Sequence, residues 1–209
     1  IDCRYCHVSV ETSAVANVND APTLQNNAVR VVDEGGMALI DASLLLTTDV
    51  DNNPSGLTYA VDQPVSAGRL ELAAAPGQAI SHFTQADIDA GLLRYVHDGS
   101  EVFADTFTFS VTDAEGALIG SVSFLIQVTP LNDSPVVSSA AGGPFRMAAG
   151  NVPQAVDAAL TLNDDDSAML SGVVIRIDGQ YMAGSDRLVL AGSHPVLATW
   201  NDADGTLTV

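Results

Sequence analysis

Short runs in which apolar and polar residues alternate dominate the chain, and this period of two is typical of β-strands with one buried face. The clearest runs are 105–112 and 119–129, whose alternating apolar residues are Phe107, Phe109, Val111, Val122, Phe124, Ile126 and Val128. A single short helix is expected at Thr84–Ala90, where Thr84 can cap the first turn and Asp87 follows three residues later. The pattern therefore predicts a mostly β protein.

The predicted strands fall into two groups that follow an extended arm at residues 1–20. In the first group, residues 21–134, we expect strands at 29–33, 38–46, 57–62, 69–73, 92–97, 105–112 and 119–129, with a turn at 113–116 that closes the last hairpin. In the second, residues 135–209, a linker at 139–143 precedes expected strands at 155–162, 172–178, 186–191, 196–200 and 206–209, with Asp204-Gly205 as a tight turn. Short strands with turns at this spacing predict two tandem antiparallel β-sandwiches.

Charge narrows the possible partners. The chain has 26 acidic residues against 7 arginines and no lysine, a formal net charge of −19. Nucleic acid is disfavoured as a partner because phosphate neutralisation needs clustered basic residues, whereas divalent cations suit such a chain. The chain holds no apolar run of about 18 residues, so no membrane span is expected. It also holds no nucleophile elbow or glycine-rich phosphate loop, so we do not expect an enzyme.

Both cysteines of the chain lie together in Cys3-Arg4-Tyr5-Cys6-His7. This is the C-x-x-C-H spacing that attaches c-type haem: the two thiols form thioether links to the vinyl groups, and the adjacent histidine becomes the proximal iron ligand. A disulfide or a free thiol pair is an alternative, and so is half of a zinc site, although no further Cys or His follows nearby. The motif predicts one covalently bound haem c.

The second axial ligand of such a haem would come from elsewhere in the chain. His194, in a Gly-Ser-His-Pro loop, is the first candidate, followed by His97 and His82. The methionines are weaker options: Met37, Met147, Met169 and Met182. For His97 we favour a structural role over iron ligation. It lies in the segment Tyr95-Val96-His97-Asp98-Gly99-Ser100, which is part of a family pattern.

A family resemblance rests on residues 82–113, HFTQADIDAGLLRYVHDGSEVFADTFTFSVTD. Together with the flanking segments 33–36, 49–51, 57–59 and 132–133, they resemble the cadherin-like repeats of chondroitin-sulfate-proteoglycan-type ectodomains and of giant bacterial surface proteins. The resemblance covers residues 21–135 strongly, and the second group of strands is similar to only the first part of a related bacterial repeat. It implies Ig-like sandwiches strung end to end, an extracellular or cell-surface location, and calcium that stiffens the joints. It does not imply a haem.

The resemblance also implies which oxygens would hold Ca²⁺. Glu34, Asp49 and Asp51 would lie at the leading end of the first sandwich, beside Asn19 and Asp20. An equivalent cluster would lie between the two sandwiches, formed by Asn132, Asp133, Asp164 and Asp166. The alternative is that these Asp and Asn residues only make turns, and for Asp202 and Asp204 turn formation is the preferred interpretation.

Two features predict contact between copies of the chain. The second group of strands is shorter than the first and has no counterpart of the strands at 107–111 and 122–128, so an incomplete sandwich with unpaired backbone groups is expected. The arm, in contrast, leads into an Asn-Asp-x-Pro segment at 19–22 just as the strand 121–131 leads into the one at 132–135. We expect the arm of one copy to complete the second sandwich of another, which would build a homopolymeric filament. The alternatives are pairing of the arm within its own chain and a polypeptide that continues past Val209.

The function predicted from these features is an extracellular mono-haem c-type cytochrome subunit on a calcium-stabilised β scaffold, with a role in electron transfer. The sequence does not indicate the redox partner. The alternative is a calcium-dependent adhesin or structural surface-fibre protein without haem.

Overall fold

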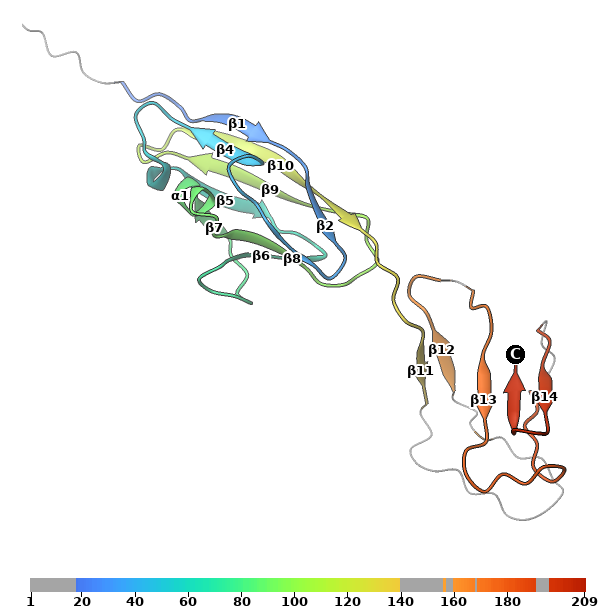
Figure 1. The fold of residues 1–209 in the computed structure, drawn as a ribbon. Coiled ribbons are helices and arrows are strands. Elements are labelled where there is room, and N and C mark those ends of the chain that lie inside the picture. Colours follow the sequence, from blue (N-terminus) through green and yellow to red (C-terminus); the bar gives the residue numbers. More distant parts are fainter. Residues whose placement is uncertain (1–17, 140–155, 157–159, 168, 191–195) are drawn as a thin grey trace, which may run out of the picture. The chain divides into compact units, whose positions relative to one another are not determined.

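The computed structural model of the chain describes residues 18–139, 156, 160–167, 169–190 and 196–209 (Figure 1). The chain divides into two compact units, Ile1–Leu131 and Asn132–Val209. In the described residues the regular structure is almost entirely β; the exceptions are the short helix α1, Gln85–Asp89, and one 3₁₀ turn, Pro54–Gly56. The prediction of an all-β protein is therefore confirmed.

The first unit is a sandwich of short strands. The bounds are β1 Thr23–Asn27, β2 Arg30–Asp33, β3 Met37–Leu39, β4 Leu45–Thr48, β5 Thr58–Gln63, β6 Gly68–Leu72, β7 His82–Thr84, β8 Leu93–His97, β9 Ala104–Thr112 and β10 Leu118–Thr129. One sheet has the order β2-β10-β9-β5-β7, and the other strands form β3-β8-β6 and the pair β1-β4. All pairs are antiparallel except β2 with β10. The parallel pair places the ends of β2 and β10 at the same end of the unit.

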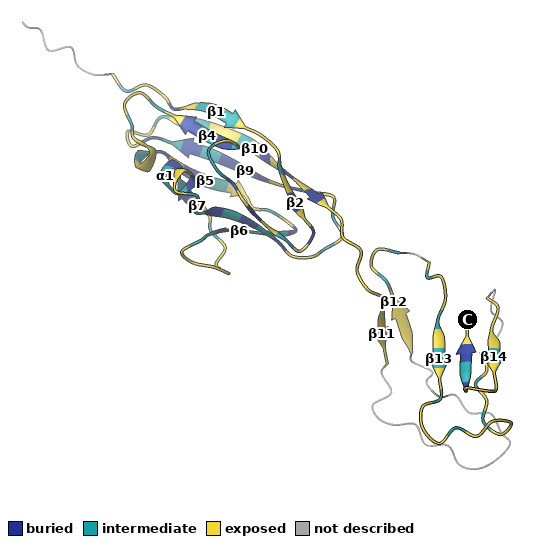
Figure 2. Ribbon diagram, in the orientation of Figure 1, coloured by how far each residue is buried: buried dark blue, intermediate teal, exposed yellow. Residues whose placement is uncertain are grey.

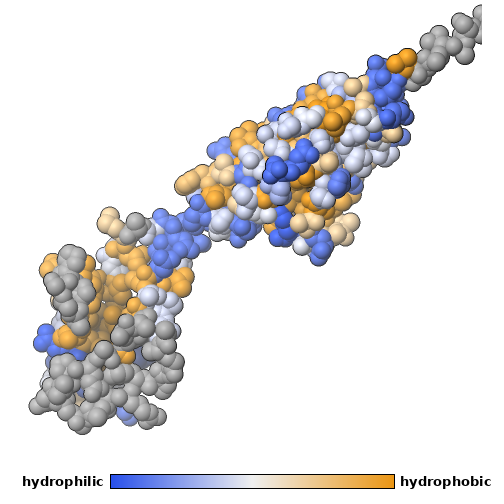
Figure 3. Space-filling view, turned by 180° about the vertical axis from the view of Figure 1, so that it is seen from behind, coloured by the Kyte–Doolittle hydropathy of each residue, from blue (hydrophilic) through white to orange (hydrophobic). Residues whose placement is uncertain are grey.

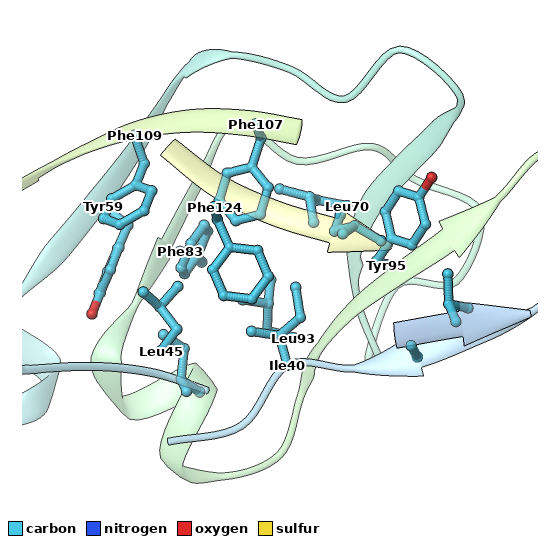
Figure 4. Close-up of a cluster of buried hydrophobic side chains, with 14 of the residues drawn as sticks. Ile40, Leu45, Tyr59, Leu70, Phe83, Leu93, Tyr95, Phe107, Phe109 and Phe124 are labelled. Carbon is cyan, nitrogen blue, oxygen red and sulfur yellow. The ribbon is translucent and has the colours of Figure 1, made fainter. Parts of the chain in front are cut away.

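Alternation along β9 and β10 fills the core, as the sequence pattern predicts. Buried positions recur along β9 (Figure 2). Phe107 and Phe109 of β9 and Phe124 of β10 are fully buried between the sheets (Figure 4). The rings of Phe107 and Phe124 stack with centroids 5.2 Å apart, and Tyr59 stacks on Phe83 at 4.7 Å. These aromatic side chains all belong to the sheet β2-β10-β9-β5-β7, and in the core they pack against buried apolar residues of the other strands.

A buried carboxylate fixes the loop that precedes β6. Asp105, with 4% of its surface exposed, accepts hydrogen bonds from the backbone amides of Ser66, Ala67 and Thr106 at 2.8–2.9 Å, and the Tyr95 hydroxyl lies 3.0 Å from its Oδ2. Burial alone would raise the pKa of Asp105, but these amide donors outweigh it and hold the pKa below its usual range. Asp105 therefore stays ionised inside the sandwich.

The short helix forms where the sequence predicts it. The Thr84 side chain accepts a hydrogen bond from the Asp87 amide, and the Asp87 carboxylate accepts one from the Thr84 amide at 2.8 Å, which makes a capping box. The first helical residue, Gln85, is buried, and its Oε1 lies 2.6 Å from the Tyr59 hydroxyl. The helix thus carries a polar anchor into the core.

One predicted strand of the first unit is wrong in detail. The run 38–46 is split between β3 and β4, because Asp41 makes a turn: its Oδ1 accepts from the Ser43 amide at 2.9 Å and its carbonyl oxygen accepts from the Leu44 amide at 2.9 Å. Ala38 and Ile40 before the turn and Leu45 after it are buried, which is why the pattern alone predicts one strand. The strands β1 and β7 have too few apolar residues to have been predicted.

The second unit has five short strands in its described part: β11 Val136–Ser138, β12 Thr161–Asn163, β13 Val174–Arg176, β14 Thr199–Asn201 and β15 Thr206–Thr208. They form the pair β11-β12 and the sheet β13-β15-β14. The strand predicted at 186–191 is wrong for its described residues, because 186–190 form no strand. The turn between β14 and β15 spans 202–205, longer than the two-residue turn expected. Leu207 is the one buried hydrophobic residue that the structure describes in this unit, and hydrophobic residues reach the surface on the face shown in Figure 3.

Candidate cation sites at the ends of the first unit

Polar side chains gather at the leading end of the first unit, defined here as the end where β1 begins and β4 and β9 finish. The Asp20 amide donates to Asp51 Oδ2 at 2.8 Å, and Asn19 Nδ2 donates to Asp113 Oδ2 at 2.7 Å. From the same turns, Asn52 Nδ2 donates to Glu115 Oε2 at 2.8 Å. Three loops that are distant in sequence therefore bring their oxygens to one end of the sandwich.

Asp113 organises the hairpin turn between β9 and β10. Its Oδ1 accepts from the amides of Glu115, Gly116 and Ala117 at 2.6–3.0 Å, and Gly116 takes the positive φ of 97° that the turn requires. The bond from Asn19, assisted by these amides, holds the pKa of Asp113 below its usual range. The carboxylate is therefore ionised at neutral pH.

Two oxygens at the leading end are buried and accept no hydrogen bond within the described part of the chain: Asn19 Oδ1 and Asp49 Oδ2. The other oxygen of Asp49, Oδ1, accepts from the amides of Asp51 and Asn52 at 2.7 and 3.0 Å, so the turn itself needs only half of this carboxylate. A buried acceptor without a donor is costly. Oxygen atoms are also the ligands that Ca²⁺ prefers, so each of these two atoms is a candidate cation ligand.

The expected position of Glu34 is wrong. Glu34 follows β2, which pairs in parallel with β10, and its Oε2 accepts from the Leu131 amide at 3.1 Å. It therefore lies at the trailing end, where β10 finishes, at the opposite end of the unit from Asp49 and Asp51. The sequence did not reveal this because β1 and β2 run in the same direction through the sandwich, separated only by a short turn.

A second group of acidic side chains lies at the trailing end. Glu34, with 8% of its surface exposed, has a carboxylate oxygen within 4.8 Å of one of Glu101. Two like charges this close repel each other unless a cation lies between them. The fold therefore brings Glu34 close to the loop between β8 and β9, which contains Glu101.

His97 has a structural role at the same end. It is 3% exposed, and its Nδ1 accepts from the amides of Gly35 and Gly99 at 3.0 and 3.1 Å; both glycines have positive φ. Because Nδ1 is an acceptor in a neutral ring, the proton lies on Nε2, which is buried without a hydrogen-bond partner in the described structure. Iron ligation through Nε2 would move that proton onto Nδ1, against two N–H donors. The geometry therefore argues against His97 as a haem ligand.

The other candidate iron ligands that lie within the described residues have no neighbours that suggest iron ligation. His82 is exposed, and its Nδ1 lies 3.0 Å from Ser81 Oγ. Met37, Met169 and Met182 are exposed as well. The remaining residues of the predicted haem site, Cys3, Cys6, His7, His194 and Met147, lie outside the described residues.

In the second unit, the expected calcium ligands make turns with one another. Asp164 Oδ1 accepts from the amides of Asp166 and Ser167 at 3.2 and 3.0 Å, and the Asp133 amide donates to Asp166. Asn132 Nδ2 donates to the Asp133 carbonyl oxygen at 2.6 Å. All four residues thus come together, in an arrangement that turn formation alone explains.

Sequence reasoning missed several acidic and amide side chains that the fold brings to these ends: Asn52, Glu101, Asp113 and Glu115. Asp113 and Glu115 lie in the segment that the sequence predicts as a hairpin turn. Glu101 lies in the loop between two predicted strands. No local signal in the sequence identifies these residues, because the return of the hairpin between β9 and β10 to the end where β1 starts depends on the parallel pairing of β2 with β10.

Comparison with known families agrees with this architecture. A family model described as cadherin-like matches residues 22–128, just over half of the chain, and these bounds enclose nearly all of β1 to β10. The chain belongs to the cadherin-like family. The matched region of this cadherin-like chain includes Glu34, Asp49, Asp51, Glu101 and Asp113, and it leaves out the cysteine motif and the second unit.

Relatives of the cadherin-like chain include extracellular proteins of animals. It is 34% identical to the human extracellular matrix organizing protein FRAS1 over 128 residues, which cover 60% of this chain and 3% of that protein. It is 38% identical to human chondroitin sulfate proteoglycan 4 over 113 residues, 54% of this chain and 5% of that protein. The predicted extracellular or cell-surface location agrees with these relatives, of which the chain spans only a small fraction.

A solved structure of a mutant SrpA adhesin from Streptococcus sanguinis overlaps 59% of this chain and 67% of that chain, with 13% identity and a TM-score of 0.26. In the described part of the cadherin-like chain, no helix is long and apolar enough to cross a membrane.

Proposed function

We propose that the chain is a segment of an extracellular structural or adhesive protein, in which a cadherin-like unit is stiffened by calcium at its ends and carries out no catalysis. The family membership and the extracellular-matrix relatives support the structural or adhesive role. Such a role needs a stable scaffold, and the buried core of the first unit, with its stacked aromatic rings, provides one.

The observation that carries the calcium proposal is the pair of buried oxygens at the leading end. Asn19 Oδ1 and Asp49 Oδ2 would contact the ion, and Asp20 and Asp51 stand in the same loops. Ca²⁺ bound there would satisfy two acceptors that lack donors and would neutralise adjacent carboxylates. At the trailing end Glu34 and Glu101 would hold a second ion, because their carboxylates lie close together.

Thermal unfolding with and without calcium tests this proposal. For an extracellular module with Kd between about 10⁻⁴ and 10⁻³ M, 10 mM Ca²⁺ stabilises the folded state by about 1.4–2.7 kcal/mol. That corresponds to a rise in Tm of roughly 5–20 °C relative to EGTA. We expect Asp49→Asn to remove the part due to the leading end, because the variant keeps the Oδ1 acceptor of the turn and replaces Oδ2.

Asp62→Asn is the matched control. Asp62 is exposed on β5, accepts one hydrogen bond from Ser110 Oγ at 3.1 Å, and carries the same charge. Its calcium-dependent rise in Tm should equal that of the wild type. A wild-type Tm that is identical in EGTA and in calcium would refute the proposal.

A second candidate function rests on the cysteine motif. The segment Cys3-Arg4-Tyr5-Cys6-His7 has the spacing of c-type haem attachment, and we propose that a haem held there would add electron transfer to the scaffold. Cys3 and Cys6 would bind the haem covalently and His7 would ligate the iron. The intact mass of protein from a host with cytochrome c maturation should then exceed the polypeptide mass by about 616 Da, with a Soret band that survives denaturation. A colourless protein of unmodified mass would end this candidate.

We also propose that the arm of one copy, residues 1–20, adds a strand to the second unit of another. The exposed hydrophobic residues of that unit support an acceptor role, because its described strands bury little apolar surface. Deleting residues 1–18 should abolish filaments in negative-stain electron microscopy. Filaments that are unchanged by the deletion would refute strand donation.

A further inference from the structure

Positive charge is concentrated on one sheet face of the first unit. The described residues of this unit include three arginines, and two of them, Arg69 on β6 and Arg94 on β8, lie on adjacent strands (Figure 1). In the strand register Arg69 pairs with Val96, and Glu71 pairs with Arg94. Because Leu70 and Tyr95 point into the core, these residues point outward. The net charge of the chain is −19, so two neighbouring arginines on one sheet face form an unusual basic surface.

Glu71 does not neutralise both arginines. Its Oε2 accepts from Arg69 Nε at 2.8 Å and from the Gly77 amide at 2.8 Å, and only 3% of its surface is exposed. The terminal Nη groups of Arg69 make no hydrogen bond to a carboxylate in the described structure, and Arg94 Nη1 contacts Met37 Sδ at 3.7 Å. The Nη groups of Arg69 and the guanidinium group of Arg94 can therefore still donate to a carboxylate, while Glu71 offsets part of the positive charge of both arginines.

Apolar side chains flank these arginines. Met37 and Leu39 of β3 are 56% and 36% exposed, and they pair with Val96 and Arg94 in the register. We call the surface formed by Met37, Leu39, Arg69, Arg94 and Val96 the arginine face. Arginine beside exposed aliphatic residues is typical of protein–protein contacts. A carbohydrate would be expected to stack on an aromatic residue, and the arginine face has none.

The leading end of the same unit has the complementary character. Val18 and Val50 are 79% and 83% exposed there, and Asp20, Asp51 and Glu115 are exposed beside them. We propose that the arginine face of one copy docks the leading end of a second copy, with carboxylates of the leading end on Arg69 and Arg94 and the valines against Met37 and Leu39.

Both charge and geometry set the character of this contact. At about 0.15 M salt the Debye length is about 8 Å, so the repulsion between two acidic chains is screened while charges in direct contact still attract each other. The two surfaces differ, so the contact is heterologous and can add copies without closing a ring. It is small and therefore weak for one pair, but it gains strength when units are repeated along a chain.

Sedimentation equilibrium of the full chain in EGTA tests the contact independently of calcium. We expect association at about 0.15 M NaCl that weakens at least tenfold at 1 M, where the Debye length is about 3 Å. Arg69→Gln with Arg94→Gln should weaken it at least tenfold at the lower salt concentration, and so should Asp20→Asn with Glu115→Gln. Glutamine at 69 retains a hydrogen-bond donor near Glu71, and far-UV circular dichroism checks that the fold is unchanged.

Two further variants keep the test decisive. Met37→Ser with Leu39→Ser removes the apolar half of the arginine face without changing charge and should also weaken association. Arg176→Gln is the control: Arg176 is 61% exposed in the second unit, 3.5 Å from Asp178, and its replacement should change nothing. A wild type that stays monomeric up to about 1 mM, or association that all the arginine-face variants leave intact, would overturn the proposal.

Discussion

Asp105→Asn tests how far one buried carboxylate holds the first unit together. In the best orientation of the new side chain, the carbonyl oxygen keeps the amides of Ser66 and Thr106, which Oδ1 accepts in the wild type. The new NH₂ group then replaces Oδ2 and faces the Ala67 amide and the Tyr95 hydroxyl. Tyr95 can turn to donate to the Ala67 carbonyl oxygen, which lies 3.0 Å away, but the Ala67 N–H keeps no acceptor.

The structure gives a magnitude for this change. One buried N–H without an acceptor costs about 1–3 kcal/mol, and the bonds that remain lose the charge of their acceptor. We expect the free energy of unfolding to fall by about 2–4 kcal/mol, and Tm to fall by roughly 10 °C or more. Urea unfolding at pH 7, followed by far-UV circular dichroism, measures this loss, with Asp62→Asn as an exposed control that should lie within about 0.5 kcal/mol of the wild type.

The same site predicts a pH dependence. Because the pKa of Asp105 is lowered in the folded state, its contribution is present above the unfolded pKa of about 3.9 and is lost as pH falls through the folded pKa. The difference in stability between wild type and Asp105→Asn should therefore shrink in acid. A loss at pH 7 smaller than about 1 kcal/mol, or a difference that persists unchanged at the lowest pH, would refute this account of the buried carboxylate.

Three other changes have expected outcomes. Phe107→Ala removes a fully buried ring that stacks on Phe124 and should cost about 3–5 kcal/mol in urea unfolding; a cost below about 1 kcal/mol would contradict the described core. Thr84→Ala removes the side chain that caps α1 and should cost about 1 kcal/mol, whereas Thr84→Ser should restore most of it. In EGTA, Asp49→Asn should be as stable as the wild type or more stable, since it replaces a buried charged oxygen that lacks a donor; a marked loss of stability in EGTA would mean that Oδ2 has a structural partner.

Alternation and capping were sufficient to predict much of the first unit. Phe107, Phe109 and Val111 gave the inward face of β9, and Thr84 with Asp87 gave the helix start, because both signals are local. The position of Glu34 was wrong because it depends on the parallel pairing of β2 with β10, a contact between residues almost one hundred positions apart. The alternation of apolar and polar residues along the chain does not indicate which strands pair with each other.

The candidate sites show the same limit. Asn19, Asp49 and Asp51 could be placed together from the resemblance, whereas the participation of Asp113 and Glu115 follows only from where the last hairpin returns. His97 illustrates a different gap: its residue type suggested ligation, but its two amide donors come from turns at Gly35 and Gly99, which only the fold brings together. The pairing of Arg69 and Arg94 depends on the register of β6 and β8 in the same way.

A crystal structure of the protein grown in about 10 mM Ca²⁺, with anomalous diffraction to identify the ion, tests the proposed calcium-stiffened scaffold most directly. The account predicts an ion at the leading end of the first unit, bound by Asn19 Oδ1 and Asp49 Oδ2. Water in hydrogen-bonding contact with both oxygens, with no anomalous signal there, would contradict it.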